Sequence, residues 1–174
     1  IDQMTERNSQ NAVQGPSSPN NLLGSLDDVD KRIVDALVRD GRQPNNALAA
    51  RVGIAPSTCL ARTRSLVDRG IIRGFRADID YSRAGADLQA VIFVRVRPAA
   101  RPGLMAMTER LAKEPGVLNV FFIAGAYDFI VHIVAANTEG LRTFVAGNLS
   151  TDTDIESTQT SVVFEHLAGQ APLG

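Results

Sequence analysis

The sequence contains one cysteine, two histidines and no tryptophan, and it lacks any long apolar run. Cys59 has no partner for an internal disulfide, and a closed zinc site would need carboxylates in addition to these three side chains. A membrane span requires about 18 consecutive apolar residues, and the polar N-terminal stretch has no signal-peptide core. We therefore expect a cytoplasmic protein with no metal, no cofactor and no membrane partner.

The formal net charge of −1 would argue against nucleic acid as a partner, but the charge is unevenly distributed. Residues 42–76 carry seven arginines against Asp68 alone, a net charge of +6, whereas the segments before and after carry −3 and −4. A basic island between acidic neighbours is typical of a localised polyanion contact. A solvated arginine-rich surface would have the same composition.

Three short helices are predicted in residues 26–76. The first begins near Asp27, where Asp27 or Asp28 can cap it, and ends before Gly41, while the second spans about 45–52. A tight turn leads to the third helix, over 56–69, where Pro56 suits the first position. This order is typical of a helix-turn-helix, and the extended residues that follow could form a small wing.

The two faces of the third helix predict its role. Its core face is expected to carry Pro56, Cys59, Leu60, Thr63, Leu66 and Val67. Its outer face is expected to carry Ser57, Thr58, Ala61, Arg62, Ser65 and Arg69. Small side chains in the first turn would allow close approach to duplex DNA, so Ser57, Thr58 and Arg62 are predicted to read bases, with Arg62 bidentate to guanine. Five further arginines are predicted to neutralise phosphates: Arg42, Arg51, Arg64, Arg73 and Arg76. The alternative is a helical hairpin with a polar outer face.

The remaining chain alternates strand-like and helical segments. Strands are predicted at 88–97, 117–124, 129–135 and 155–164, with helices near 104–111 and 141–145. The resulting β-α-β-β-α-β order is the ferredoxin-like arrangement, so the fold class is α+β. Phe and Val on both faces of the sheet predict burial on both, and therefore dimerisation.

These patterns predict a domain organisation. The expected segments are a disordered tail (1–25), a helix-turn-helix domain (26–76), a linker (77–87), an α+β domain (88–166) and a C-terminal tail (167–174).

Several stretches resemble the Lrp/AsnC family of transcriptional regulators. They are Leu-Asp-Asp-Val-Asp at 26–30, Asp-Gly-Arg at 40–42, Leu-Ala-Ala-Arg-Val-Gly-Ile-Ala-Pro at 48–56, Cys-Leu-Ala-Arg at 59–62 and Gly-Ile-Ile-Arg-Gly-Phe at 70–75. Gly-Ala-Tyr-Asp-Phe at 125–129 extends the resemblance into the second domain. It implies a regulator of amino-acid metabolism genes that binds double-stranded DNA as dimers, often assembled into octamers, and responds to an amino acid. The resemblance further implies that residues 88–166 form an effector-binding and oligomerisation domain.

The resemblance also implies an effector site between C-terminal domains. The expected residues are Gly125, Ala126, Tyr127, Asp128, Thr158 and Thr160. Ala126 departs from the family's common Gly-Asp-x-Asp loop, which leaves Asp128 alone to hold an ammonium group. Pro44 departs as well, because the family usually has a capping Ser or Thr there, and Asn45 or Asn46 is expected to take over that role. The structural alternative for the loop and strand residues is a tight turn and ordinary strand threonines.

Three other functions share features with this sequence. An RNA recognition motif shares the β-α-β-β-α-β order, but this half of the chain is acidic. An enzyme built on Tyr127, Asp128 and His132 is disfavoured because alternation along a strand turns Tyr127 away from the other two side chains. His132, His166 and Cys59 are therefore expected to be structural. An architectural protein that wraps DNA with little sequence preference remains the alternative to a specific regulator.

Overall fold

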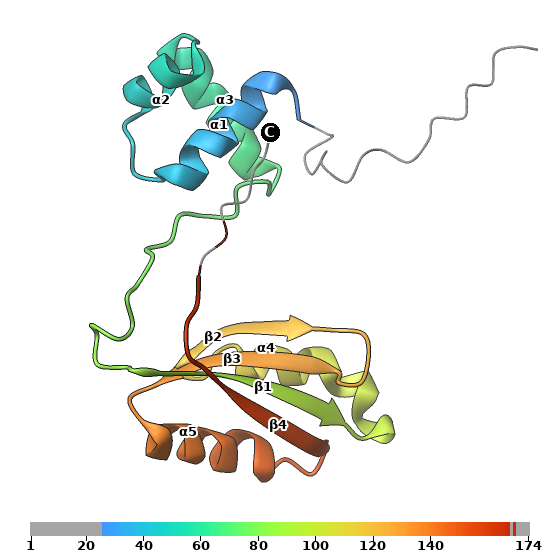
Figure 1. The fold of residues 1–174 in the computed structure, drawn as a ribbon. Coiled ribbons are helices and arrows are strands. Elements are labelled where there is room, and N and C mark those ends of the chain that lie inside the picture. Colours follow the sequence, from blue (N-terminus) through green and yellow to red (C-terminus); the bar gives the residue numbers. More distant parts are fainter. Residues whose placement is uncertain (1–25, 168, 170–174) are drawn as a thin grey trace, which may run out of the picture. The chain divides into compact units, whose positions relative to one another are not determined.

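The computed structural model describes residues 26–167 and 169, so the predicted tail at 1–25 and most of the predicted tail at 167–174 lie outside the described residues. The chain folds into two compact units (Figure 1). The first unit ends at Ala77 and the second begins at Asp78.

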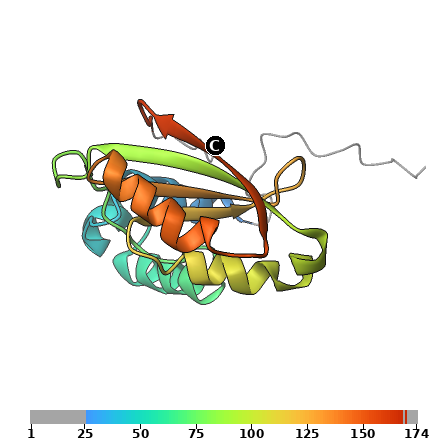
Figure 2. The ribbon, with the colours of Figure 1, turned by 90° about the horizontal axis from the view of Figure 1, so that it is seen from below.

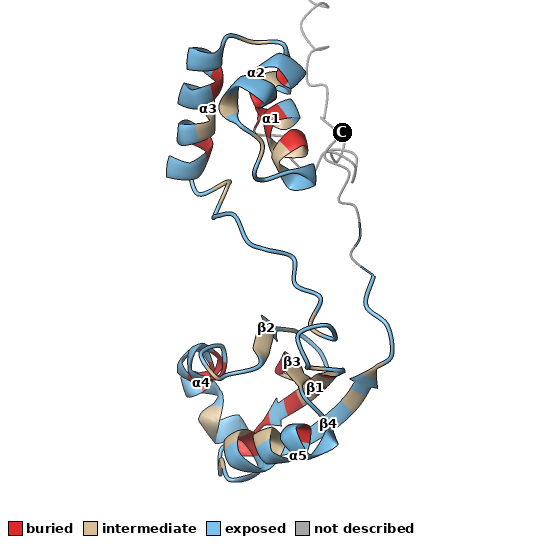
Figure 3. Cartoon of the chain, turned by 90° about the vertical axis from the view of Figure 1, so that its left-hand side faces the viewer, coloured by how far each residue is buried: buried red, intermediate tan, exposed pale blue. Residues whose placement is uncertain are grey.

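The first unit consists of three helices: α1 (Asp28–Arg39), α2 (Asn45–Val52) and α3 (Pro56–Asp68). Of the two predicted caps, Asp27 is the one that caps α1, because its carboxylate accepts a 2.8 Å hydrogen bond from the Asp30 N–H. Gly53 ends α2 with φ 78°, a left-handed conformation that glycine adopts without strain. The buried side of each helix faces the other two (Figure 3), around Ile33, Leu48 and Leu66.

The predicted cap of α2 is wrong. No side chain caps α2, and the Asn45 side chain instead donates to the Pro56 carbonyl across 2.9 Å. Residues 73–80, where a small wing was possible, are extended and form no strand. Ile71 and Ile72, which precede them, pack against the three-helix core, and the Phe75 ring lies against Gly41.

The second unit is a four-stranded sheet with helices. Its elements are β1 (Leu88–Val96), the 3₁₀ helix η1 (Pro98–Gly103), α4 (Leu104–Leu111), β2 (Val117–Phe122), β3 (Phe129–Ala135), α5 (Thr138–Val145), the π-helical turn η2 (Ala146–Ser150) and β4 (Ile155–Val163). The strand order is β2-β3-β1-β4, and all three pairings are antiparallel. This arrangement confirms the ferredoxin-like α+β fold.

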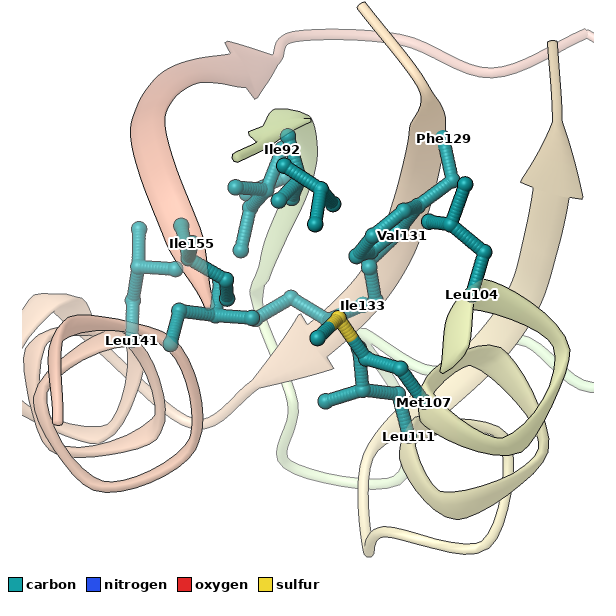
Figure 4. Close-up of a cluster of buried hydrophobic side chains, with 13 residues drawn as sticks. Ile92, Leu104, Met107, Leu111, Phe129, Val131, Ile133, Leu141 and Ile155 are labelled. Atoms are coloured by element: carbon teal, nitrogen blue, oxygen red, sulfur yellow. The ribbon is translucent and has the colours of Figure 1, made fainter. Parts of the chain in front are cut away.

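Helices α4 and α5 lie along the same face of this sheet (Figure 2). Alternate residues of β1 and β3 point toward them, and Ile92, Phe129 and Val131 are fully buried there. Figure 4 shows Leu111 of α4 and Leu141 of α5 converging on these strand residues. We call this side of the sheet the helix face, and the opposite side the outer face.

The outer face carries large apolar side chains. One row crosses all four strands, because Phe121 pairs with Ile130, Ile130 with Phe93, and Phe93 with Gln159. Phe121 is 49% exposed, and Ile130 and Phe93 are half-buried. In the part of the chain that the structure describes, no helix has the length and apolar character needed to cross a membrane.

Candidate DNA-binding helix and effector loop

The exposed face of α3 is the candidate contact surface for DNA. Ser57, Thr58 and Ala61 are exposed, as the sequence pattern predicts, and so is Arg64. Ala55, which precedes the helix, offers no side-chain cap. The first-turn N–H groups therefore stay free of side-chain caps and can meet phosphate oxygens.

The buried face of α3 differs from its prediction. Cys59 and Leu66 are fully buried and Thr63 is half-buried, but Pro56 is exposed and Leu60 and Val67 are 41% and 44% exposed. Their assignment to the core is wrong. Helices α1 and α2 present a small surface, and α3 contacts it only through a narrow stripe that contains residues 59, 63 and 66. Leu60 thus lies on the side that carries Ser57 and Arg64.

Arg62 lies at the edge of the buried stripe rather than in the middle of the exposed face. Its Nη1 is 2.6 Å from Asp27 Oδ2 and 2.8 Å from Asp30 Oδ1. The hydrogen bonds that Arg62 donates to Asp27, and next to Asp30, raise the pKa of Arg62. The pKa of Asp27 is lowered, first by the N–H of Asp30 and then by Arg62. The guanidinium predicted to read guanine is therefore engaged by two carboxylates of the same unit.

The other arginines of the basic island are all exposed. Arg69 lies 3.6 Å from Asp30 Oδ2. Within the described residues, no ion pair engages the remaining five, which are those predicted to meet phosphates: Arg42, Arg51, Arg64, Arg73 and Arg76. These five guanidinium groups can meet an external anion without first breaking an internal pair.

The predicted effector loop joins β2 to β3. Gly125 has φ 140°, a conformation that side-chain-bearing residues rarely adopt. Asp128 is committed to the fold: its Oδ2 accepts the Val96 N–H at 2.8 Å, and its Oδ1 lies 3.5 Å from Arg101 Nε. Its carboxylate is therefore occupied on both oxygens, which weakens the prediction that it holds an ammonium group.

Tyr127 extends from this loop over the outer face. Its hydroxyl donates to Gln159 Oε1 on β4, and its ring lies 5.3 Å from the Phe93 ring between centroids. The Arg95 guanidinium carbon is 5.7 Å from the Tyr127 centroid, and Arg95 Nε donates to the Ala126 carbonyl across 2.8 Å. Sequence reasoning missed Arg95 and Gln159. Strand alternation could have indicated Gln159, because it places this side chain on the face of β4 opposite to the face that carries Thr158 and Thr160.

Thr158 and Thr160 lie on the helix face, since they pair with the buried Val94 and Ile92. Within one chain, therefore, they do not join Tyr127. Thr160 instead borders an open hollow of about 360 Å³ beside α5, together with Leu141 and Arg142. The six predicted effector residues thus divide between two places on the second unit.

The two histidines lie together on the outer face. His132 Nε2 is 3.1 Å from Gln89 Oε1, and its ring centroid is 6.0 Å from that of His166. Burial, and next the charge of His166, lower the pKa of His132. No carboxylate or nucleophile accompanies them among the described contacts, in keeping with a structural role.

Comparison with known families and proteins matches both units. Residues 26–73 match a winged helix-turn-helix DNA-binding family, and residues 89–172 match the Lrp/AsnC ligand-binding domain. The chain is 48% identical to the HTH-type transcriptional regulator AldR of Mycobacterium tuberculosis over 172 residues, 99% of this chain and 94% of the relative. It is 34% identical to the leucine-responsive regulatory protein of Rhizobium meliloti, over 82% of this chain and 91% of the relative.

Solved structures give the same result. The crystal structure of the M. tuberculosis AldR protein matches with a TM-score of 0.71 at 48% identity, over 84% of this chain and all of that one (100%). A transcriptional regulator of Neisseria meningitidis, solved as a complex with L-Met, matches with a TM-score of 0.76 at 30% identity, over 85% of this chain and 97% of that one. These relatives are regulators rather than enzymes, as predicted for this chain. The chain is a DNA-binding transcriptional regulator, and it belongs to the Lrp/AsnC family.

Proposed function

We propose that the chain recognises a specific DNA sequence as a dimer, placing two α3 helices in successive major grooves. The target is then a pseudo-palindrome with half-sites about one helical turn apart, or a multiple of that spacing. The observation that carries this proposal is the first turn of α3, where Ser57 and Thr58 are small, hydroxylic and exposed. A cytoplasmic location is part of the same proposal.

The assignment of base contacts follows from which side chains are free. Ser57 and Thr58 are free to reach base edges, whereas Arg62 would first have to leave Asp27 and Asp30. We therefore retain Ser57 and Thr58 as base-reading residues and remove Arg62 from that set. The five arginines without an internal ion pair are proposed to neutralise phosphates: Arg42, Arg51, Arg64, Arg73 and Arg76.

A pair of variants tests this division. Thr58→Val keeps the shape of the side chain but removes its hydroxyl, so it should weaken binding to the target sequence about fivefold or more and leave binding to shuffled DNA unchanged. Arg73→Ala should weaken binding to both DNAs by the same factor and reduce the slope of log affinity against log salt by about 0.9. Fluorescence anisotropy titrations across a salt series measure both effects. Equal losses on both DNAs for Thr58→Val would contradict its role in reading bases.

We also propose that an amino acid is the effector and that genes of amino-acid metabolism are the targets. The match to a ligand-binding domain and the L-Met complex of a relative support this class of ligand. Between the two candidate places, we favour the loop at Gly125, Ala126 and Tyr127, because the aromatic ring and the Arg95 guanidinium meet beside it. The hollow at Thr160 is the second place, and Thr158 lies on the same face.

An effector can change DNA binding only through different affinities for two arrangements of the assembly. We propose that these arrangements differ in the spacing of their α3 helices. An effector bound between C-terminal domains would favour one spacing and so one set of half-sites.

Two substitutions test the effector site. Ala126→Asp supplies the acid that the family's loop usually has, so it should tighten amino-acid binding about tenfold through a charge-assisted bond. Thr160→Val should leave that affinity unchanged. Isothermal titration calorimetry with each amino acid measures both. If Thr160→Val loses amino-acid binding and Ala126→Asp gains no affinity, the effector site would be the hollow beside α5 instead of the loop.

Gel-shift titrations with and without each amino acid distinguish a regulator from an architectural protein. Saturable binding that resists competitor DNA and shifts with one amino acid supports the regulator. Binding with no sequence preference and no response to any amino acid would support DNA wrapping instead.

A further inference from the structure

Arg62 connects the recognition helix to the start of α1. Its Nη1 bonds Asp27 Oδ2 at 2.6 Å and Asp30 Oδ1 at 2.8 Å. The Arg62 side chain is 36% exposed, and that of Asp30 only 11%. Arg62 is 35 positions from Asp27 and 32 positions from Asp30 in the sequence. These contacts therefore fix one helix against another, and not one turn of a helix against the next.

Both aspartates have further partners that hold them in place. The second oxygen of Asp27 accepts the Asp30 N–H at 2.8 Å, which ties this carboxylate to the first turn of α1. The second oxygen of Asp30 lies 3.6 Å from Arg69 Nη1. Arg62 and Arg69 are seven residues apart, about two helical turns, so they lie on the same side of α3. Asp30 is thus held between two points along that helix.

The apolar contacts of α3 form a narrow stripe, in which Cys59 and Leu66 are the buried side chains. A rotation of α3 about its axis that separates Arg62 from Asp30 would leave a nearly buried carboxylate without this partner, which is costly. The ion pairs therefore add a directional constraint on α3 to the constraint of the apolar stripe.

We propose that Arg62 is a positioning residue that sets the rotation of α3 through Asp27 and Asp30, and thereby presents Ser57 and Thr58 to the major groove. This inference rests on the proposed role of α3 as the base-reading helix. The proposal predicts that removing the negative charge of Asp27 or Asp30 weakens specific DNA binding, the opposite of what electrostatics alone predicts. Removing a negative charge beside a polyanion favours binding on electrostatic grounds alone, whereas loss of a positioning contact weakens specific binding.

The test uses the full chain and a DNA duplex that the parent protein selects from random sequences, compared with a shuffled duplex. Asp30→Asn and Asp27→Asn each remove the charge that Arg62 contacts. Asn caps helices about as well as Asp, so Asp27→Asn preserves the α1 cap and gives a folded variant even if Asp30→Asn does not fold. Asp28→Asn is the matched control, because Asp28 is exposed, lies in the same turn of α1 and forms no ion pair within the described residues. Circular dichroism establishes which variants are folded at the assay temperature.

We expect Asp27→Asn, and Asp30→Asn where it folds, to lower the ratio of affinities for selected and shuffled DNA about tenfold, with Asp28→Asn unchanged or binding slightly more tightly. Arg62→Ala should lower the same ratio without changing the salt slope, since loss of a phosphate contact would reduce that slope by about 0.9. The proposal is overturned if the folded Asp27→Asn and Asp30→Asn variants bind the selected DNA as tightly as the parent or more tightly, and Arg62→Ala reduces the salt slope. Arg62 would then be a direct DNA ligand. If the parent selects no sequence at all, base reading by α3 has itself failed, and the role of Arg62 fails with it.

Discussion

Three aspartates of this chain, among others, are engaged by arginine side chains. Asp27, Asp30 and Asp128 each contact at least one arginine, and Asp27 and Asp128 also accept a backbone N–H. A carboxylate in such a setting stabilises the fold locally, because a charge-assisted hydrogen bond is stronger than a neutral one. Asp128, which the sequence predicts to be available for a ligand, is therefore already engaged inside the protein.

Gly116 is the residue at which a single added carbon should cost the most. It has φ 85°, and a Cβ there would lie 2.6 Å from the Val134 carbonyl oxygen. Val134 also donates its N–H to the Gly116 carbonyl at 2.8 Å, so the two backbones cannot separate freely. We expect Gly116→Ala to lower the free energy of unfolding by roughly 1–3 kcal/mol, measured by urea denaturation.

Gly147→Ala is the control for this substitution. Gly147 lies in the helical turn after α5, and a Cβ there would meet no atom within 4 Å. Its replacement should leave stability unchanged or raise it by up to about 1 kcal/mol, because alanine favours helix over glycine. Similar losses in the two variants would contradict the steric account of Gly116.

The orientation of α3 could be predicted from the sequence only in part. The repeat of apolar residues placed Cys59 and Leu66 in the core, but it also included Leu60 and Val67, which are exposed. A helical wheel cannot distinguish a core contact from an apolar residue facing outward. The decisive contact, between Arg62 and Asp30, joins residues 32 positions apart and leaves no periodic signal.

The secondary structure itself was easier to predict. Helix α2 and strand β3 have the predicted bounds, because proline and glycine mark the start and end of α2, and the turn at 125–128 precedes β3. Side-chain partners across the sheet were not predictable in the same way. The contact between Tyr127 and Gln159 depends on β1 lying between β3 and β4, which the order of elements alone does not specify.

The outer face of the sheet should make stability depend on pH through His132. Burial, and next the charge of His166, lower its pKa below the usual 6.5. As the pH falls, the unfolded chain takes up the proton first, so stability is fully present above pH 6.5 and declines as the pH falls through that value. Urea midpoints measured on both sides of this pH should show the decline, and His132→Gln should reduce it. An equally steep decline in His132→Gln would assign the effect to other groups.

At the scale of the whole molecule, the apolar outer face is the proposed surface for dimerisation. Phe121 is 49% exposed there, in a row with Ile130 and Phe93. Phe121 lies on the edge strand β2, and a charge placed there would have to be buried in any dimer that uses this row. We expect Phe121→Glu to reduce the oligomeric state measured by sedimentation velocity.

Val38→Glu is the matched control, because Val38 is 59% exposed and lies on α1 in the other unit. It should sediment like the parent protein. An unchanged oligomer in Phe121→Glu, or a reduced one in Val38→Glu, would place the main interface elsewhere. Disruption of the dimer should also weaken DNA binding, since two half-sites would no longer be held by one particle.

The central claim, that the first turn of α3 reads DNA, is tested most directly by one ratio. Affinity is measured at physiological salt for the selected duplex and for a shuffled duplex of the same length and composition. The account predicts that the parent protein prefers the selected duplex by about a thousandfold or more, and that Thr58→Val reduces this preference. A ratio near one for the parent, or a ratio that Thr58→Val leaves unchanged, would contradict it.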